Sequence, residues 1–460
     1  MPSGSVATGP LTDSEHSRHL RRAALASTVG TAIEWYDFLL YGQVAALVFG
    51  KLFFPHSAPL VATLQALATY FVGFVARPVG AAIFGHFGDR VGRKATLIAT
   101  LLITGLATFA VGLVPTYASI GIWGAIILTI LRLIQGIGVG GEWGGSVLLA
   151  MEWSKTSKNR GLITSFPQLG GPGGLLLANI AVLVFSGSMS SEAFLAWGWR
   201  IPFFLSAVMV VIGLWIRLGI LETPAFRQIV AENRVERVPV LEVLKRQPKE
   251  VVLTALVRMA EQAPAYVYFV FVFTYGINVL HFSRNFLLSA VVVAAAVDLA
   301  MISLFGHLSD RIGRRRMYFL GALATAAYGL VYFPLLNTMI PAVVFIAIVL
   351  SMVPHSMVYG PQAALIAERF TPRLRYSGCS LGYQLASLVA GGPAPLIATA
   401  LLASFGSGYP VGLYICACGV VSMIVVMVLV DYTNRDISQE HDAPSPAASL
   451  AGEAPGVARS

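Results

Sequence analysis

The chain has 460 residues, of which 56% are hydrophobic and only 12% charged, and its mean hydropathy is +0.75. Soluble globular proteins carry about 25% charged residues, so this composition excludes an ordinary soluble domain and predicts a protein of the membrane. The formal net charge is +9. No DNA- or RNA-binding motif accompanies the basic residues, so we expect no nucleic-acid partner.

Long apolar blocks separated by short polar segments predict twelve membrane-spanning helices, because a helix needs about 20 apolar residues to cross the hydrocarbon core. We therefore expect an all-α membrane protein made of two six-helix bundles. In chain order the expected spans are 24–50, 60–86, 95–115, 119–150, 161–186, 201–220, 252–280, 286–308, 317–336, 340–366, 378–404 and 410–432.

The same pattern divides the chain into two bundles and three other segments. We expect an N-terminal tail at 1–23, a first bundle at 24–221, a loop at 222–250, a second bundle at 251–432 and a tail at 433–460. The last segment is rich in Ala, Ser, Pro, Gly and acidic residues, a composition that is typical of disorder.

Basic residues concentrate in alternate connections between the expected spans. One set of connections holds most of them, at 21–22, 90–94, 155–160, 227–249, 311–316 and 369–375. The opposite set contains little more than Lys51, Arg200 and Arg284. By the positive-inside rule, both termini and the loop at 222–250 are expected in the cytoplasm, with the chain crossing a bacterial inner membrane many times.

The first expected span carries Glu34, Asp37 and Tyr41, which recur at helical spacing and share one face. An ionised carboxylate inside a membrane is costly, so each acid is a candidate for function. A carboxylate that alternates between an apolar setting and a nearby arginine can bind and release a proton. We expect proton coupling at Asp37, the deeper acid, and at Glu34. The alternative is that both form fixed ion pairs that hold helices together.

Arg132 lies in the middle of the fourth expected span, one turn from Gln135 on the same face. A permanently charged guanidinium can hold Asp37, or it can bind a solute carboxylate through two parallel hydrogen bonds. Tyr41, Arg132 and Gln135 are therefore candidate solute ligands. Arg77 ranks second, because it lies nearer the end of its helix, where its side chain can reach the membrane surface.

The second half offers a different set of polar side chains inside its spans. His355, Tyr359 and Gln362 share a face by their spacing, and an intramembrane histidine can relay protons or simply hydrogen-bond between helices. Asp298 lies in the middle of the eighth span, and proton coupling, solute selection and ion pairing are all open for it. The candidate solute ligands of this half are Arg258, Tyr266, His355, Tyr359, Gln362, Tyr383 and Gln384.

An internal repeat marks the loop after the second span of each half: Gly85-His-Phe-Gly-Asp-Arg-Val-Gly-Arg-Lys94 recurs as Gly306-His-Leu-Ser-Asp-Arg-Ile-Gly-Arg-Arg315. Glycines allow tight turns, and each aspartate can accept hydrogen bonds from arginines or from a helix N-terminus. Two copies at matching positions favour a gate over a loop that only sets topology. The expected gating residues are Gly85, Asp89, Arg90, Arg93, Glu142, Glu152 and Arg160, and in the second half Gly306, Asp310, Arg311, Arg314, Glu368 and Arg375.

These paired loops resemble the signature of the major facilitator superfamily. Further segments resemble its metabolite:proton symporter family, and bacterial shikimate transporters most: Glu34-Trp-Tyr-Asp-Phe38, Arg77-Pro-Val-Gly80, Arg132-Leu-Ile-Gln-Gly136, Gly140-Gly-Glu-Trp-Gly-Gly145 and Trp197-Gly-Trp-Arg-Ile-Pro-Phe203. The resemblance covers residues 21–431. It implies twelve helices, alternating access and proton-coupled uptake of an organic anion or zwitterion.

We therefore expect a secondary active transporter that imports a small organic acid, shikimate-like or another carboxylate metabolite, together with protons. The alternatives are a proton-coupled exporter and a symporter of a zwitterionic osmolyte such as proline or betaine. An enzyme or sensor is not expected, because no nucleophile–base set, HExxH or GxSxG motif is found. We expect no metal and no cofactor apart from the coupling proton. The expected partners are a small-molecule substrate and the lipid bilayer, and the expected state is a monomer.

Overall fold

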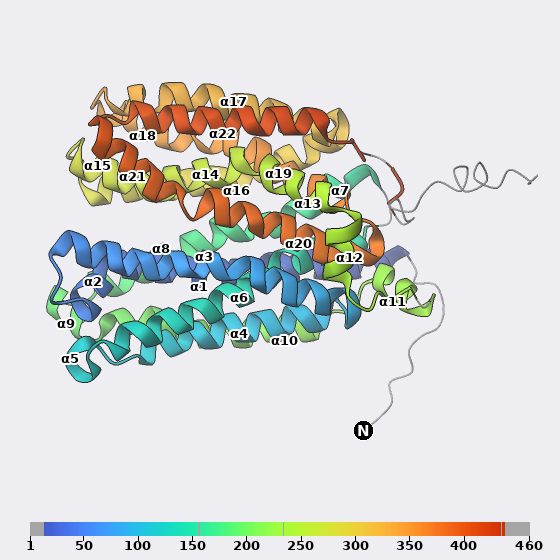
Figure 1. The fold of residues 1–460 in the computed structure, drawn as a ribbon, viewed down its shortest axis with the longest axis horizontal. Helices are drawn as coiled ribbons and strands as arrows, with labels where there is room; N and C mark the ends of the chain where they lie inside the picture. Colours follow the sequence, from blue (N-terminus) through green and yellow to red (C-terminus); the bar gives the residue numbers. More distant parts are fainter. Residues whose placement is uncertain (1–12, 155–156, 233, 434, 438–460) are drawn as a thin grey trace, which may run out of the picture.

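The computed structural model describes residues 13–154, 157–232, 234–433 and 435–437. These residues form helices and connecting turns, with no strand among them. Figure 1 shows two bundles of roughly parallel helices lying side by side, one for each half of the chain. Residues 1–12 of the expected N-terminal tail, and most of the tail expected at 433–460, lie outside the described residues.

The first bundle contains six long helical rods, of which three are built from consecutive helical segments. In chain order its elements are α1 (Asp13–Val44) with η1 (Ala45–Phe49) and α2 (Gly50–Phe53), α3 (Pro59–Arg90), α4 (Arg93–Leu113), α5 (Tyr117–Ile120), α6 (Trp123–Glu152), η2 (Ser157–Asn159), α7 (Arg160–Gln168) with α8 (Gly170–Gly187), α9 (Ser191–Ala196), η3 (Gly198–Arg200) and α10 (Ile201–Leu218).

Two short helices, α11 (Pro224–Ala231) and α12 (Pro239–Arg246), connect the bundles. The second bundle then follows with α13 (Pro248–Val257), α14 (Met259–Tyr266), η4 (Val267–Phe271) and α15 (Val272–Asn278), then α16 (Arg284–Ile312), α17 (Arg314–Leu336), α18 (Pro341–Leu350) with α19 (Met352–Ala367), η5 (Pro372–Leu374) with α20 (Arg375–Ala386), η6 (Ser387–Gly391) and α21 (Ala394–Phe405), and α22 (Tyr409–Val428).

Within the described residues, each of the twelve expected spans coincides with one rod, and the expected all-α class is confirmed. Ten rods are long and apolar enough, by length and composition, to cross a membrane. The two others are α1–α2 and α13–α15, which carry charged side chains near their centres: Glu34 and Asp37 in the first, Arg258 and Glu261 in the second. A span with such residues is expected to face the interior of the bundle rather than lipid.

Glycines let α3 and α6 approach each other closely, which places the charged side chains of the two helices next to one another. A Cβ atom at Gly140 of α6 would lie 2.9 Å from the backbone nitrogen of Ala81 and 3.0 Å from the carbonyl carbon of Arg77. One at Gly136 would lie 2.8 Å from the Cβ of Ala76. Small residues at such crossings are the usual means of close helix packing in membranes.

The two halves meet most closely at the end of the molecule that carries α11 and α12, here called the α11–α12 end (Figure 1). There α20 lies against α3 and α6, and α7 lies against α16 and α19. A buried apolar cluster crosses this contact, with Trp143 and Val147 from α6 and Phe370, Tyr376 and Cys379 from the second half. The halves are therefore joined at this end by both apolar and polar contacts.

We expect Gly140→Ala to lower the melting temperature of the purified protein, because the added Cβ meets the backbone of α3 on a side where nothing flexible can move away. Overpacking of this kind costs about 1–3 kcal/mol, which outweighs the gain of about 0.5–1 kcal/mol from replacing a helical glycine. The matched control is Gly187→Ala at the end of α8, where no atom lies within 4 Å of the new Cβ. Equal melting temperatures for the two variants would contradict the close approach of α3 and α6.

Candidate functional site

Four charged side chains gather inside the first bundle, where α1, α6 and α10 meet. Arg217, in the last turn of α10, lies 3.7 Å from the Oε1 of Glu34 through its Nη1 and 3.2 Å from the Oε1 of Glu142 through its Nη2. Asp37 follows Glu34 by one turn and faces the hydroxyls of Thr108 and Ser206. All four charged side chains are at most 3% exposed, so this is a charged cluster closed off from solvent.

A second feature of the first bundle is a pair of arginines that lie against the same aromatic ring. The guanidinium carbon of Arg132 lies 3.7 Å from the ring centre of Phe38, and that of Arg77 lies 3.8 Å from it. Arg132 donates to Gln135 at 3.1 Å, and Gln135 donates to Thr108 at 2.6 Å. Such contacts with aromatic faces stabilise a cation without neutralising it.

Neither of these two arginines has a carboxylate partner within the described part of the chain. Both are at most 1% exposed, yet no ion pair of the described residues includes them. The Nη2 atoms of both Arg77 and Arg132, and the Nε of Arg77, make no hydrogen bond with described residues. Asp37 is likewise absent from the ion pairs of these residues, so the Asp37–Arg132 pair considered from the sequence is not formed in this conformation.

In the second bundle, Arg258 forms the centre of a separate polar group. It donates to Glu261 at 2.8 Å, and also to the side chain of Gln262 and the carbonyl of Tyr383. Its guanidinium carbon lies 3.2 Å from the centre of the Tyr383 ring. The Trp143 indole of the first bundle stacks on the same ring at 3.7 Å, so Tyr383 joins the two halves through its two faces.

A small cavity of about 10 Å³ lies between the two bundles and is lined by members of these groups. The first bundle contributes Glu34, Trp35, Arg77, Val139, Glu142 and Trp143 to its wall, and the second contributes Tyr383 and Gln384. A volume near 10–15 Å³ admits about one water molecule. The structure is therefore closed around this point, and two acids of the first bundle line the cavity together with Arg77.

His355 of α19 and Asp298 of α16 form a buried histidine–carboxylate pair. The Nδ1 of His355 lies 3.0 Å from the Oδ1 of Asp298, and the same oxygen accepts a hydrogen bond from Ser356 at 2.5 Å. The imidazole ring also lies 5.1 Å from the ring of Tyr359, measured between centres. Tyr359 and Gln362, on the same helix, face the Arg258–Glu261 group, where Gln362 donates to Glu261 at 3.3 Å.

The remaining predicted solute ligands lie nearer the first bundle. The Tyr41 hydroxyl is 2.8 Å from that of Thr69, and its ring centre is 4.7 Å from the guanidinium carbon of Arg132. The ring of Tyr266 packs edge-on against Phe74, with 5.4 Å between centres. Gln384 is at 3.4 Å from the carbonyls of Val139 and Gly140. The structure thus brings ligands predicted in both halves to the same central region.

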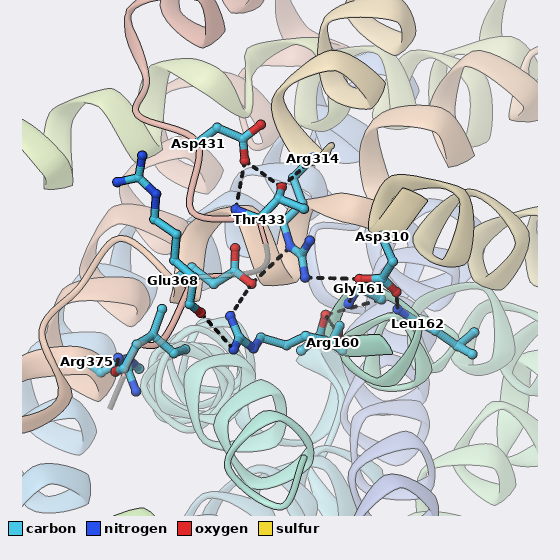
Figure 2. A network of polar contacts seen from close by, with 12 residues as sticks. Arg160, Gly161, Leu162, Asp310, Arg314, Glu368, Arg375, Asp431 and Thr433 are labelled. Carbon is cyan, nitrogen blue, oxygen red and sulfur yellow. Dashed lines mark hydrogen bonds and ion pairs between the residues drawn. The ribbon is translucent and has the colours of Figure 1, made fainter. Parts of the chain in front are cut away.

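The aspartates of the two repeated loops occupy equivalent positions at the α11–α12 end. Asp89 accepts hydrogen bonds from the backbone nitrogens of Tyr376, at 3.3 Å, and Ser377, at 2.9 Å, at the start of α20. Asp310 accepts them from Gly161, at 2.8 Å, and Leu162, at 2.9 Å, at the start of α7 (Figure 2). Each acid therefore caps the N-terminus of a helix from the opposite half, which the helix dipole favours.

Arginines surround both caps, and here the predicted gating residues come together. Arg93 pairs with Asp89 at 3.5 Å and with Glu152 at 3.2 Å. Around the second cap, Figure 2 shows three further pairs: Arg314 with Asp310 at 3.1 Å, Arg314 with Glu368 at 3.0 Å, and Arg160 with Glu368 at 2.8 Å. The Arg160–Glu368 pair connects the two halves directly.

Other predicted gating residues take different positions. Arg90 and Arg311 are exposed. Arg375 donates to the carbonyls of Phe370 and Ile437, at 2.9 and 2.7 Å. The repeated glycines lie at the contact itself. A Cβ at Gly85 would lie 2.8 Å from the Cα of Ser377, and one at Gly306 would lie 2.7 Å from the Cβ of Ser165.

Glu142 belongs to the charged cluster around Arg217, and no sequence pattern singled out Arg217 itself. Its place in the last turn of α10 is typical of a basic residue that marks the membrane surface. The structure instead turns its side chain inward and leaves it 1% exposed. Trp143, Gln262 and Tyr318 are further buried polar contacts that the sequence did not indicate. The partners of Trp143 and Tyr318 lie on other helices, so spacing along one helix could not reveal them, whereas Gln262 accepts from Arg258 one turn earlier.

Comparison with known proteins gives a consistent result. The family model described as Major Facilitator Superfamily matches residues 38–392 and 301–454. The chain is 39% identical to the shikimate transporter of Escherichia coli (strain K12), over 94% of this chain and 99% of that protein. It is 39% identical to an inner membrane metabolite transport protein of the same strain, over 88% and 93%. It is 33% identical to the proline/betaine transporter of that strain, over 93% and 86%.

Among solved structures, the chain is similar to a proton:xylose symporter of the major facilitator superfamily bound to 6-bromo-6-deoxy-D-glucose. The TM-score is 0.75, with 92% of this chain and 98% of that chain covered. The sequence identity is only 15%, so this likeness concerns the fold.

We expect Asp89→Ala to loosen the contact at the α11–α12 end, because the N-terminus of α20 loses its capping acid. Loss of a cap costs about 0.5–2 kcal/mol, which corresponds to an increase of about 2- to 30-fold in the open population. Cys379 is buried in this contact and reports on it. In a Cys416→Ser/Cys418→Ser background, N-ethylmaleimide should label Cys379 faster by that factor. Glu242→Gln, at a partly exposed site on α12, is the control. An unchanged labelling rate would show that the cap does not hold the halves together.

Proposed function

The chain belongs to the Major Facilitator Superfamily, and from that premise we propose that it imports a small organic acid by proton symport. The protein is a multi-pass membrane transporter and not an enzyme. The observation that carries the proposed substrate class is the pair of buried arginines, Arg77 and Arg132, which have no carboxylate partner within the described residues.

A buried guanidinium without a counter-ion is costly in a bundle that excludes water. The carboxylate of an organic acid supplies the missing charge, and Arg132 presents the planar donor geometry that binds a carboxylate through two hydrogen bonds. Arg77 lines the central cavity together with Tyr383 and Gln384 of the opposite bundle. A solute bound there therefore contacts both halves, as alternating access requires.

The substrates named for the relatives narrow the substrate class proposed for this chain. The E. coli relative that is 39% identical over nearly the full chain transports shikimate by name, so hydroxylated carboxylic acids of similar size are the first candidates. The hydroxyl and amide groups of Tyr41, Gln135, Tyr266 and Gln384 are suitable partners for the hydroxyls of such a solute. In the present conformation the cavity is too small for it, so the site opens to admit its substrate.

A second candidate is the symport of a zwitterion such as proline or betaine, the substrates named for a relative of 33% identity. One observation favours it: Glu34 and Glu142 line the same cavity as Arg77. A zwitterion could place its carboxylate toward the arginine and its cationic nitrogen toward the acids. Binding of shikimate and of betaine to the same purified protein distinguishes the two substrate classes.

Proton coupling is assigned to Asp37, with Glu34 as its neighbour. Both acids belong to α1, and Asp37 directly precedes Phe38, the ring that lies against both arginines. Protonation of Asp37 removes a negative charge near the two arginines, where the substrate carboxylate would bind. Repulsion between the two carboxylates is thereby avoided. The positive-inside rule places the α11–α12 end in the cytoplasm of a bacterial cell, with the chain in the inner membrane. The conformation described here is then closed toward the cytoplasm, and the direction of flux distinguishes import from export.

We expect Asp37→Asn to abolish accumulation of radiolabelled shikimate in proteoliposomes driven by a pH gradient, acid outside, because a neutral amide cannot bind and release the proton. Exchange of labelled for unlabelled shikimate at equal pH should persist, since the arginines remain. The two assays use the same vesicles. Normal accumulation by the variant would exclude Asp37 as the coupling residue.

We expect Arg132→Gln to weaken shikimate binding by about 10- to 100-fold, since hydrogen bonds to charged groups contribute about 1.5–3 kcal/mol. Arg132→Lys keeps the charge but loses the planar pair of donors, so its affinity for shikimate should lie between those of Arg132→Gln and the wild type. Binding is measured by isothermal titration calorimetry in detergent. Arg284→Gln, at the exposed start of α16, is the control. Equal affinity of Arg132→Gln and Arg284→Gln would exclude Arg132 as a substrate ligand.

A further inference from the structure

Arg217 is a fully buried arginine whose guanidinium is held in place from several sides. Besides its ion pairs with Glu34 and Glu142, it donates to the carbonyl of Leu97 on α4. Gly30 of α1 provides the space for it, because a Cβ there would lie 2.9 Å from both the Nε and the Cζ of Arg217. Three neighbouring helices thus fix the position of one positive charge.

Glu142 is held just as firmly. Its Oε1 accepts a hydrogen bond from Thr31 of α1 at 2.9 Å, another from Ser146 one turn along α6, and the contact of Arg217 at 3.2 Å. Glu34 has only the longer contact with Arg217, at 3.7 Å, and its carboxylate oxygens make no hydrogen bond with described residues. Arg217 is therefore placed between one well-bound acid and one loosely bound acid.

The charges of this cluster do not balance if every group is ionised. Glu34, Asp37 and Glu142 would carry three negative charges against the single positive charge of Arg217. The groups that face the cluster from neighbouring helices are Arg77, which lines the same cavity, and the phenols of Tyr376 and Tyr383 on α20. From α4 it faces neutral groups, the hydroxyls of Thr100 and Thr108 and the carbonyl of Leu97. Because isolated carboxylates are costly in such surroundings, the closed cluster holds protons.

On the basis of the proton symport proposed above, we propose that Arg217 is a positioning residue for proton coupling, acting as the shared counter-ion of Glu34 and Glu142. It balances the negative charge of Glu142, so that the carboxylate of Glu34 takes up a proton as the site closes, in addition to the proton that Asp37 binds. That carboxylate becomes a neutral carboxyl group, and it releases the same proton to water when the site opens on the other side. Glu142 thereby becomes part of the coupling cluster.

The position of the cavity supports this role. Glu34 and Glu142 line the same cavity as Arg77, and the cavity has room for about one water molecule. A proton that reaches this water can pass to Glu34, while a substrate carboxylate at Arg77 would add a negative charge next to the same acids. Substrate binding and protonation of Glu34 therefore favour each other electrostatically.

The first test compares melting temperatures of purified variants, without substrate, at about pH 5.5 and about pH 8. Arg217→Gln should lose stability at the higher pH and much less at the lower pH, because protonated carboxyls need no counter-ion. Removing one acid as well, in Arg217→Gln/Glu142→Gln, should restore the melting temperature at high pH. The control is Arg200→Gln at the other end of α10. Arg200 donates to the carbonyls of Gly112 and Val114, so its substitution should lower the melting temperature by the same amount at both pH values.

The second test measures transport of radiolabelled shikimate. Arg217→Gln should reduce accumulation driven by a pH gradient by about 10-fold or more. It should also shift the pH optimum of exchange to higher pH, because the acids keep their protons to higher pH without the nearby arginine. Arg217→Lys should retain coupled accumulation. Three results would each overturn the proposal. Arg217→Gln could lower the melting temperature equally at both pH values, as Arg200→Gln does, or the double variant could show no recovery of melting temperature at high pH. The third result is unchanged accumulation of shikimate by Arg217→Gln. If the wild type accumulates no shikimate or other acid, the proposed symport fails, whereas a failure confined to the Arg217 variants concerns this inference alone.

Discussion

Burial of charge in an apolar helical bundle is the constraint on which the rest of this structure depends. Arg77, Arg93, Arg132, Arg217, Arg258 and Arg314 are among the largest fully buried side chains. Each needs a counter-charge or a set of acceptors, because little water is present to stabilise it. Four of them pair with acids of this chain, and two, Arg77 and Arg132, rest on the Phe38 ring instead. This difference separates arginines that pair with acids inside the bundle from the two that the proposed function leaves to a bound anion.

The same constraint explains the contact at the α11–α12 end. Asp89 and Asp310 each combine an ion pair within their own half with hydrogen bonds to the N-terminus of a helix from the other half. Such a contact is strong only while the halves are together, since each acid then satisfies backbone donors that otherwise have no partner. When the halves separate, the arginine partners stay with the acids, which limits the cost of opening. A contact of this kind suits a gate that opens repeatedly.

The chemistry of the two halves differs although their framework is shared. The first bundle holds the surplus of acids around Arg217 and, around Phe38, two arginines that pair with no acid of the described residues. The second bundle holds more nearly neutral groups, Arg258 with Glu261 and His355 with Asp298. Tyr383, stacked between Trp143 and Arg258, joins the two sets across the centre. Movement of one bundle against the other would therefore change the surroundings of the first-bundle charges without dismantling the second-bundle groups.

The sequence by itself determined the class of fold, the twelve spans and the repeated loops, because hydropathy and internal repetition are properties of contiguous segments. It also singled out Glu34, Asp37 and Arg132, since a charge inside an apolar segment is visible without any knowledge of neighbours. Only the tertiary structure decided which charges meet. Arg217 is indistinguishable in sequence from a basic residue at a membrane surface, and Gly30 makes room for it from another helix. Likewise, Arg132 could have paired with Asp37, but the packing of α3 against α6 places it over Phe38 beside Arg77. Pairing of charges depends on the rotation and approach of whole helices, and no single segment encodes that.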